Sequence, residues 1–177
     1  PITIFWVVSF TNVVNLMDGL DGLAAGVSAI ASVTIILVAL QEGYYTVAVM
    51  TAALAGGIIG FIRYNFNPAT IFMGDTGSMF IGGATVAIAM VLRMPILLLL
   101  IAATMIASSL SVIIQRAYFK ATHGKRIFKM SPIHHHFEKS GMTEPQIVAM
   151  YTAVTGVLSI AAVLSLRNQR RELIEVA

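Results

Sequence analysis

The sequence has no cysteine and very few charged residues. Only 11% of its 177 residues are charged and 58% are hydrophobic, whereas soluble domains average about 25% charged residues. Without cysteine, the chain can form neither disulfides nor thiolate metal sites. The scarcity of charge excludes an ordinary soluble domain and predicts that lipid covers much of the apolar surface. The formal net charge is only +3, and we expect no nucleic-acid partner.

Long apolar runs occupy most of the chain. Runs of roughly 17–25 apolar residues are long enough for transmembrane helices. The fourth run reaches that length only if its helix begins near Thr76. The pattern predicts an all-α, polytopic transmembrane bundle of about six helices, in one membrane domain over residues 1–177. The runs are the one ending near Leu16, Leu23–Leu40, Thr46–Ile62, Phe80–Leu92, Ile96–Phe119 and Gln146–Leu166.

Three polar stretches interrupt these runs. If the six spans alternate in direction, the loops at 17–22, 63–79 and 120–145 all lie on one face of the membrane. This face carries more lysine and arginine, so the positive-inside rule places it in the cytoplasm. A cluster of arginines at 167–171 favours the opposite orientation. In either orientation the three polar stretches share a face.

The first polar stretch holds a dense group of oxygen acceptors. Asp18 and Asp21 lie three residues apart beside Asn15, in a chain with only eight acidic residues. If a helix begins at Asp18, both carboxylates lie on one of its faces. Acids next to membrane spans tend to be functional. The alternative is that they solvate a loop or cap a helix.

The second polar stretch, residues 72–78, opens the fourth helix. Backbone N–H groups at a helix start can hold a phosphate, and Asp75 offers the oxygen ligands that Mg²⁺ prefers. Thr76 and Ser78 can equally be ordinary helix caps. Phe72 can stack on a base or anchor the helix at the membrane interface. Asn65, in the preceding segment, is typical of a turn.

The third polar stretch contains His134, His135 and His136. Contiguous histidines cannot all face one way, which argues against a three-histidine zinc site. One or two of them can bind a phosphate or exchange a proton near neutral pH. The lysines and arginines at 125–129 favour an anionic ligand, and the alternative is a basic loop that touches anionic lipid headgroups. Gln115, near the end of the fifth span, can contact a neighbouring helix or face the site.

Three motifs together resemble a known enzyme family. NLMDGLDGLAAG, FMGDTGSMFIGG and GKRIFKMSPIHHHFE occur in this order and between these spans. They are similar to motifs of the polyprenyl-phosphate N-acetylhexosamine-1-phosphate transferases, over residues 12–166. The PIHHHFE string is the most specific part, and it favours the branch that transfers phospho-N-acetylmuramoyl-pentapeptide.

The resemblance implies a fold, a reaction and a location. The family fold has ten transmembrane helices, so this chain corresponds to the C-terminal half of a longer enzyme. The implied reaction moves phospho-N-acetylmuramoyl-pentapeptide from its UDP carrier to undecaprenyl phosphate, releases UMP and requires Mg²⁺. It takes place at the cytoplasmic face of the bacterial cytoplasmic membrane, and the family leads us to expect a homodimer.

The resemblance also implies residue roles. Asp75 matches the magnesium-binding acid, and the catalytic set is Asp18, Asp21, Asp75 and His134. The substrate-binding set is Asn15, Gly19, Leu20, Asn65, Phe72, Gln115, His134 and His135.

Two departures from the family pattern bear on activity. The family's DDxxK-type motif is absent from this sequence, and Ser108 stands where an acid is usual. We therefore expect the isolated chain to be inactive. Two other interpretations remain open: a transferase for N-acetylglucosamine phosphate and an inactive membrane fragment. A third is a metal transporter that uses the histidine loop, but no ionisable residue lies deep within a span, which counts against it.

Overall fold

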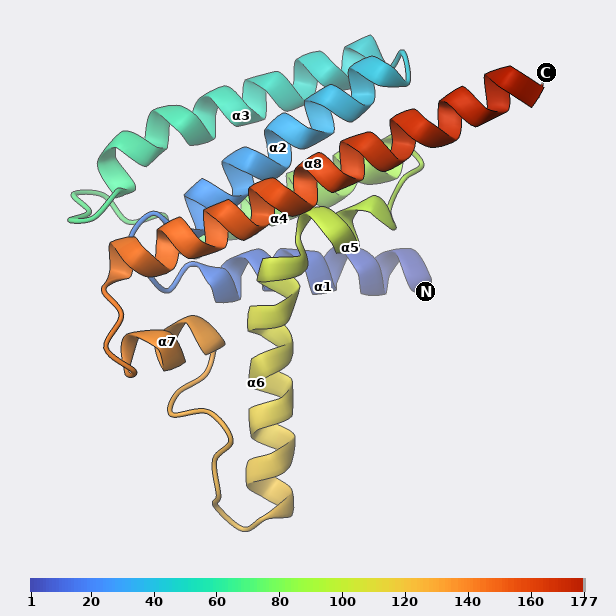
Figure 1. Cartoon of the computed structure of the whole chain (residues 1–177). Coiled ribbons are helices and arrows are strands. Elements are labelled where there is room, and N and C mark those ends of the chain that lie inside the picture. Colours follow the sequence, from blue (N-terminus) through green and yellow to red (C-terminus); the bar gives the residue numbers. More distant parts are fainter. Residues whose placement is uncertain (177) are drawn as a thin grey trace.

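The structure, a computed structural model, describes residues 1–176, with side chains for residues 1–168. These residues form eight α-helices and no strand, which confirms the all-α prediction (Figure 1). The helices are α1 (Ile2–Met17), α2 (Leu23–Gln41), α3 (Tyr45–Asn65), α4 (Gly74–Val91), α5 (Leu97–Ile101), α6 (Ala103–Ala121), α7 (Ile133–Glu138) and α8 (Glu144–Val176).

Within the described residues, four helices are long and apolar enough to cross a membrane: α2, α3, α4 and α8. The chain is therefore a multi-pass membrane protein. Helix α1 is apolar but has only 16 residues. Helix α4 begins at Gly74, two residues before the start expected from its apolar length.

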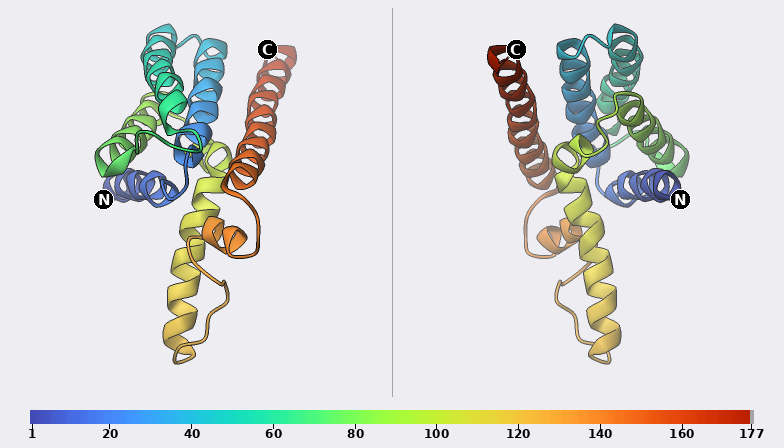
Figure 2. Two further views of the ribbon diagram at one scale, coloured as in Figure 1. Left: turned by 90° about the vertical axis from the view of Figure 1, so that its left-hand side faces the viewer. Right: turned by 90° about the vertical axis from the view of Figure 1, so that its right-hand side faces the viewer.

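The expected fifth span, Ile96–Phe119, is divided. Ala102 has φ −98° and ψ 18°, outside the usual helical range, and it separates α5 from α6. Figures 1 and 2 show α6 leaving the bundle crosswise to the membrane-spanning helices. The prediction of one continuous span at this place was wrong, because an apolar run does not reveal a change of direction within it.

The core is built mainly from three helix contacts. Helix α2 packs against α3 and α8, and α1 packs against α4. At Gly82 of α4, a Cβ atom would lie 2.9 Å from the Cα atom of Thr11 in α1, so only glycine permits this close approach. By contrast, Gly56, Gly57 and Gly60 have no described atom within 4 Å of an added Cβ. These three glycines therefore make no close helix contact within the described residues.

The polar loops gather at one end of the bundle. The turn between α1 and α2, the loop between α3 and α4, and the start of α8 lie together at the left of Figure 1. The turn between α2 and α3 lies at the other end. Helix α8 begins with a bond that is typical of a capping box, since the Thr143 N–H donates to Gln146 Oε1 at 3.0 Å.

Candidate active site

Asn15 joins the first two polar stretches. It lies in the last turn of α1, and its Nδ2 donates to Asp75 Oδ1 at 2.9 Å and to Ser78 Oγ at 3.0 Å. Both acceptors belong to the first turns of α4. The α1–α4 packing therefore brings residues 60 positions apart into one polar cluster.

Asp18 is the half-buried carboxylate of this cluster. Burial raises the pKa of Asp18, a hydrogen bond with the backbone of Gly74 lowers it, and the negative charge of Asp75 raises it further. The net direction is upward. Two acids of different sequence stretches are thus close enough to repel each other, an arrangement that a bound cation would relieve.

Asp21 has a different environment from Asp18. The segment 18–22 is a turn and α2 begins only at Leu23, so the expectation that a helix places both acids on one face was wrong. Asp21 Oδ2 accepts from the Ala69 N–H at 2.8 Å and from Asn67 Nδ2 at 3.4 Å. These bonds tie the first polar stretch to the α3–α4 loop.

Glu144, at the start of α8, completes this connection. Its Oε2 accepts from the Asp21 N–H at 3.3 Å and from Asn67 Nδ2 at 3.2 Å. Sequence reasoning missed both Glu144 and Asn67. The only signal was that Glu144 borders a span and Asn67 precedes a proline, and neither fact indicates a partner.

Asn65 lies buried at the end of α3 and links the same two loops. Its Oδ1 accepts from the Gly22 N–H at 3.2 Å, and its Nδ2 donates to the Ile71 carbonyl at 3.1 Å. Gly22 has φ +78°, a left-handed conformation that glycine adopts at little cost. In this structure the oxygen and the nitrogen of the Asn65 side-chain amide both bind loop backbone. A contact between Asn65 and substrate stays a prediction.

The histidine segment (residues 132–138) meets the acidic turn (residues 18–22) at Gly19. A Cβ atom on Gly19 would lie 2.7 Å from His134 Nε2 and 3.0 Å from His135 Nε2. This contact brings the third polar stretch to the other two. The adjacent Leu20 is buried in the apolar core, so its side chain packs inward.

His134 is fully buried, and neither of its ring nitrogens has a hydrogen-bond partner among the described residues. The pKa of His134 is lowered to about 4, chiefly by burial and also by His135, while Glu138 acts in the opposite direction. The ring is therefore neutral at physiological pH. A neutral imidazole has one donor and one acceptor nitrogen, so His134 can donate to a phosphate or sugar oxygen, or accept from a hydroxyl.

The other two histidines hold the segment itself. His135 Nδ1 lies 2.9 Å from Glu138 Oε2, and His136 Nδ1 accepts from the Lys129 N–H at 3.1 Å. The first residue of α7 is anchored as well, because the Ile133 N–H donates to Ser111 Oγ of α6 at 2.9 Å. Helix α6 thus positions α7, although it leaves the bundle.

Gln115 of α6 binds the loop that precedes α7. Its Oε1 accepts from the N–H groups of Ile127 and Phe128, each at 3.0 Å, and its Nε2 donates to the Phe128 carbonyl at 3.1 Å. The side chain is buried. It fixes the shape of the loop in this structure, and a contact between Gln115 and substrate stays a prediction.

Phe72 and Ser108 lie in contrasting places. Phe72 is 74% exposed on the α3–α4 loop, next to the polar cluster and available for stacking. Ser108 is fully buried, and its Oγ lies 3.0 Å from the hydroxyl of Tyr151 in α8. Ser108 therefore connects α6 to α8.

The polar cluster fits Mg²⁺ better than zinc. No group of three or more histidine, aspartate or glutamate side chains with metal-ligand geometry occurs among the described residues. Mg²⁺ commonly uses one or two carboxylates together with waters and substrate phosphates. Asp75 and Asp18 provide this number of carboxylates at one place, and Asp75 is exposed.

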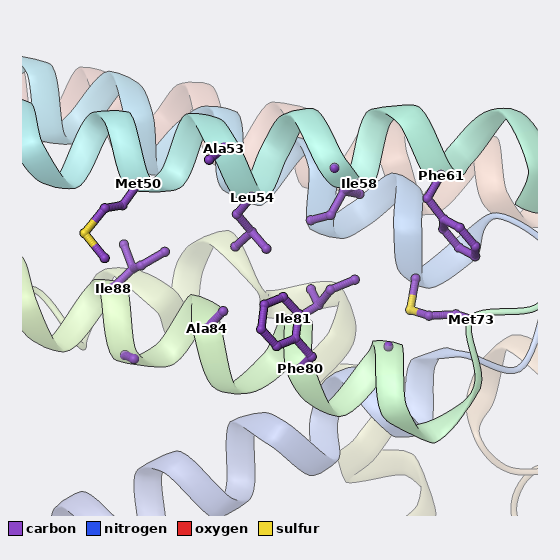
Figure 3. Close-up of a pocket in the computed structure, with 13 residues that line it drawn as sticks. Met50, Ala53, Leu54, Ile58, Phe61, Met73, Phe80, Ile81, Ala84 and Ile88 are labelled. Atoms are coloured by element: carbon purple, nitrogen blue, oxygen red, sulfur yellow. The ribbon is translucent and has the colours of Figure 1, made fainter.

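An apolar groove begins beside the cluster. It has a volume of about 630 Å³ and runs between α3 and α4 from Met73 to Met50 (Figure 3). Apolar side chains and glycines line it, including Leu54, Ile58 and Phe80. It suits a hydrocarbon chain and offers no group for polar chemistry.

Comparison with known proteins agrees with this geometry. The model of glycosyl transferase family 4 matches residues 1–93, more than half of the chain. The chain belongs to glycosyl transferase family 4.

Its relatives carry a more specific name. The chain is 45% identical to the phospho-N-acetylmuramoyl-pentapeptide-transferase of Clostridium botulinum (strain Eklund 17B / Type B), over 94% of this chain and 51% of that protein. It is 49% identical to the protein of the same name from Clostridium kluyveri (strain ATCC 8527 / DSM 555 / NBRC 12016 / NCIMB 10680 / K1), over 94% of this chain and 52% of that protein. The chain spans about half the length of the curated relatives that it matches. Its apolar helices and these relatives place it in the bacterial cytoplasmic membrane.

Proposed function

We propose that this chain forms part of a transferase that moves phospho-N-acetylmuramoyl-pentapeptide from its UDP carrier to undecaprenyl phosphate. UMP leaves, and the product is the first lipid intermediate of peptidoglycan synthesis. The observation that carries the proposal is the convergence of three polar stretches at one end of a membrane bundle. Asn15 contacts Asp75 at 2.9 Å, and Gly19 lies against His134.

Catalysis of phosphoryl transfer depends mainly on positioning the reactants and on electrostatic stabilisation of the transferred group. In our proposal Asp75 holds Mg²⁺, with Asp18 beside it. When bound, Mg²⁺ supplies charge stabilisation for the diphosphate and for the departing UMP. Asn15 fixes the Asp75 carboxylate through its hydrogen bond of 2.9 Å. Burial and the negative charge of Asp75 raise the pKa of Asp18.

The remaining site residues bind the donor in this proposal. His134 is neutral and has unused ring nitrogens, so it can hydrogen-bond to the diphosphate or the sugar. Phe72 is exposed and can stack on uracil. The resemblance places Asp21 in the catalytic set, and its bonds to Ala69 and Asn67 lead us to propose that it acts by shaping the loops around the donor. We propose the same role for Asn65 and Gln115, beside their predicted contacts with substrate.

The location of the site suits a lipid acceptor. Its phosphate can reach the helix ends from the bilayer, and we propose that this end faces the cytoplasm, as the lysine and arginine distribution indicates. We also propose that the enzyme acts as a homodimer and that the chain is one half of a single membrane domain.

The test is Mg²⁺-dependent release of UMP from UDP-N-acetylmuramoyl-pentapeptide and undecaprenyl phosphate. It is run on this chain alone and with the N-terminal half of a related enzyme, after the two have been shown to assemble. We expect turnover only with the added half, because the DDxxK-type motif is missing here. Turnover by the chain alone would refute the expected inactivity, and no turnover in either case would favour an inactive fragment.

One alternative concerns the donor. A transferase for N-acetylglucosamine phosphate would share the acidic motifs, so the same assay with UDP-N-acetylglucosamine separates the two. The names of the relatives favour the muramoyl-pentapeptide donor.

A further inference from the structure

Glu144 joins three elements of the molecule through one oxygen atom. It is the first residue of α8 and is half-buried. Its Oε2 accepts from the Asp21 N–H at 3.3 Å, in the turn between α1 and α2, and from Asn67 Nδ2 at 3.2 Å, in the loop between α3 and α4. The carboxylate suits this place, because the N-terminus of a helix carries partial positive charge. The start of α8 is thereby tied to both the turn and the loop.

Two acids from other elements hold the loop between α3 and α4 (residues 66–73). Asp21 Oδ2 accepts from the Ala69 N–H at 2.8 Å and from Asn67 Nδ2 at 3.4 Å. Glu144 accepts from the same Asn67 nitrogen. Because Asn67 donates to both carboxylates, it offsets the repulsion between their negative charges. Loss of the Glu144 carboxylate would therefore remove an acceptor from the Asn67 side chain and from the Asp21 N–H together.

Phe72 depends on this loop for its position. The ring is 74% exposed, so few side-chain contacts fix it, and the backbone that carries it decides where it lies. Phe72 follows Ala69 by three residues, and Ala69 is the point at which Asp21 holds the loop backbone. A ring that stacks on a base binds it better when the loop is already ordered, because ordering a loop on binding costs free energy.

We infer that Glu144 is a positioning residue for the uridine half of the UDP donor. The inference rests on the proposed function, in which Phe72 stacks on uracil. Glu144 acts through Asn67 and the Asp21 backbone, and among the described residues no hydrogen bond joins it to the acids of the proposed Mg²⁺ site. It therefore contributes to the affinity for the donor and not to the stabilisation of charge at the diphosphate.

Hydrogen exchange on the chain itself tests the bonds of Glu144. Glu144→Ala should accelerate exchange of the Asp21 and Ala69 amides by about tenfold, the effect of losing one hydrogen bond to a charged group. Glu144→Gln should preserve most of the protection, because an amide oxygen also has two lone pairs for the two donors.

Gln146→Ala is the matched control for this measurement. It removes the bond to the Thr143 N–H at the same helix start, and Gln146 has no hydrogen bond to the turn or the loop among the described residues. Both amides should exchange as in the wild type. Equal acceleration in Gln146→Ala would overturn the inference, because fraying of α8 would then explain the effect. Unchanged exchange in Glu144→Ala would overturn it as well.

Kinetics of the chain assembled with the N-terminal half of a related enzyme test the role in donor binding. Glu144→Ala should raise the KM for the UDP donor by about tenfold. The kcat and the KM for undecaprenyl phosphate should stay nearly unchanged, which is the pattern of a lost binding interaction. In a Phe72→Ala background the same substitution should have little further effect, because both changes act on one contact.

Three outcomes of the kinetic test decide between the alternatives. Additive effects of Glu144→Ala and Phe72→Ala would overturn the inference, because Glu144 would then not act through the ring. A loss confined to kcat would overturn it too. Absence of UMP release by the wild-type assembly would instead refute the proposed function, and the exchange data would still decide whether Glu144 holds the loop.

Discussion

The acidic loops and the histidine segment meet at Gly19, but their buried polar side chains differ in how fully they are hydrogen-bonded. In the acidic loops, Asp21 and Asn65 use their side chains to hold the backbone of a neighbouring loop. In the histidine segment, His134 is fully buried without a hydrogen-bond partner among the described residues. Burying an unpaired polar group costs stability. Under our proposal, the difference separates groups that build the site from groups that bind a ligand.

The same distinction divides the two aspartates of the first polar stretch. Asp21 is tied to Ala69 and Asn67, whereas Asp18 lies beside Asp75 with a raised pKa. Position in the sequence does not distinguish them, because both belong to the repeated Asp-Gly pattern. Their partners in space do.

The largest effect is expected at the two neighbouring acids. In the assembled enzyme, Asp75→Asn or Asp18→Asn should reduce UMP release by about 100-fold or more, because each removes charge from the proposed Mg²⁺ site. Asp21→Asn is the comparison, since a neutral amide oxygen can still accept from the Ala69 N–H, and a much smaller loss is expected. Equal losses for all three would remove the distinction between the two kinds of aspartate.

The buried imidazole should make the protein sensitive to acid. The pKa of His134 falls from 6.5 to about 4 on folding, so the unfolded chain binds a proton first. The stability that is present above pH 6.5 is therefore lost as the pH falls towards 4, by about 3 kcal/mol at 1.36 kcal/mol per unit. The raised pKa of Asp18 acts with the opposite sign.

Thermal unfolding between pH 7.5 and 4 measures this loss. His134→Gln should flatten the dependence, whereas His123→Gln, at an exposed loop position, should leave it as in the wild type. An unchanged slope in His134→Gln would show that this ring is not the source of the acid sensitivity.

The contact at Gly19 should tolerate no side chain. Gly19→Ala places a Cβ atom 2.7 Å from His134 Nε2, and such overpacking costs about 1–3 kcal/mol. The imidazole resonances of His134 and His135 should shift with it. Gly56→Ala, where no described atom lies within 4 Å, is the matched control. Equal thermal midpoints for the two variants would mean that the two regions touch less closely than described.

The smallest effect is expected at the loop before α7. Gln115→Leu removes the three hydrogen bonds to Ile127 and Phe128, and the net cost is about 1 kcal/mol. Hydrogen exchange at the two amides should accelerate. Gln115→Glu keeps the acceptor oxygens and should preserve most of the protection. Fast exchange in the wild type itself would show that Gln115 does not hold the loop.

Much of this architecture could be predicted from sequence. The lengths of the apolar runs predicted most of the long helices, and the alternation of their directions predicted that the three polar stretches lie at one end. The division at Ala102 could not be predicted, because apolar residues continue on both sides of the break. The hydrogen-bond partners of Asp21 could not be predicted either. Glu144 lies 123 residues after Asp21 in the sequence, and only the packing of α8 on α2 brings the two together.

The bonds of Glu144 have a consequence for assembly of the protein in the cell. Glu144 is the first residue of the last helix, yet it accepts hydrogen bonds from the first polar turn and from Asn67. A chain made from its N-terminus onward presents Asp21 and Asn67 to the membrane before α8 exists. The acidic turn therefore acquires the hydrogen bonds of Glu144 only after α8 has been inserted, so completion of this part of the site depends on a helix made more than a hundred residues later.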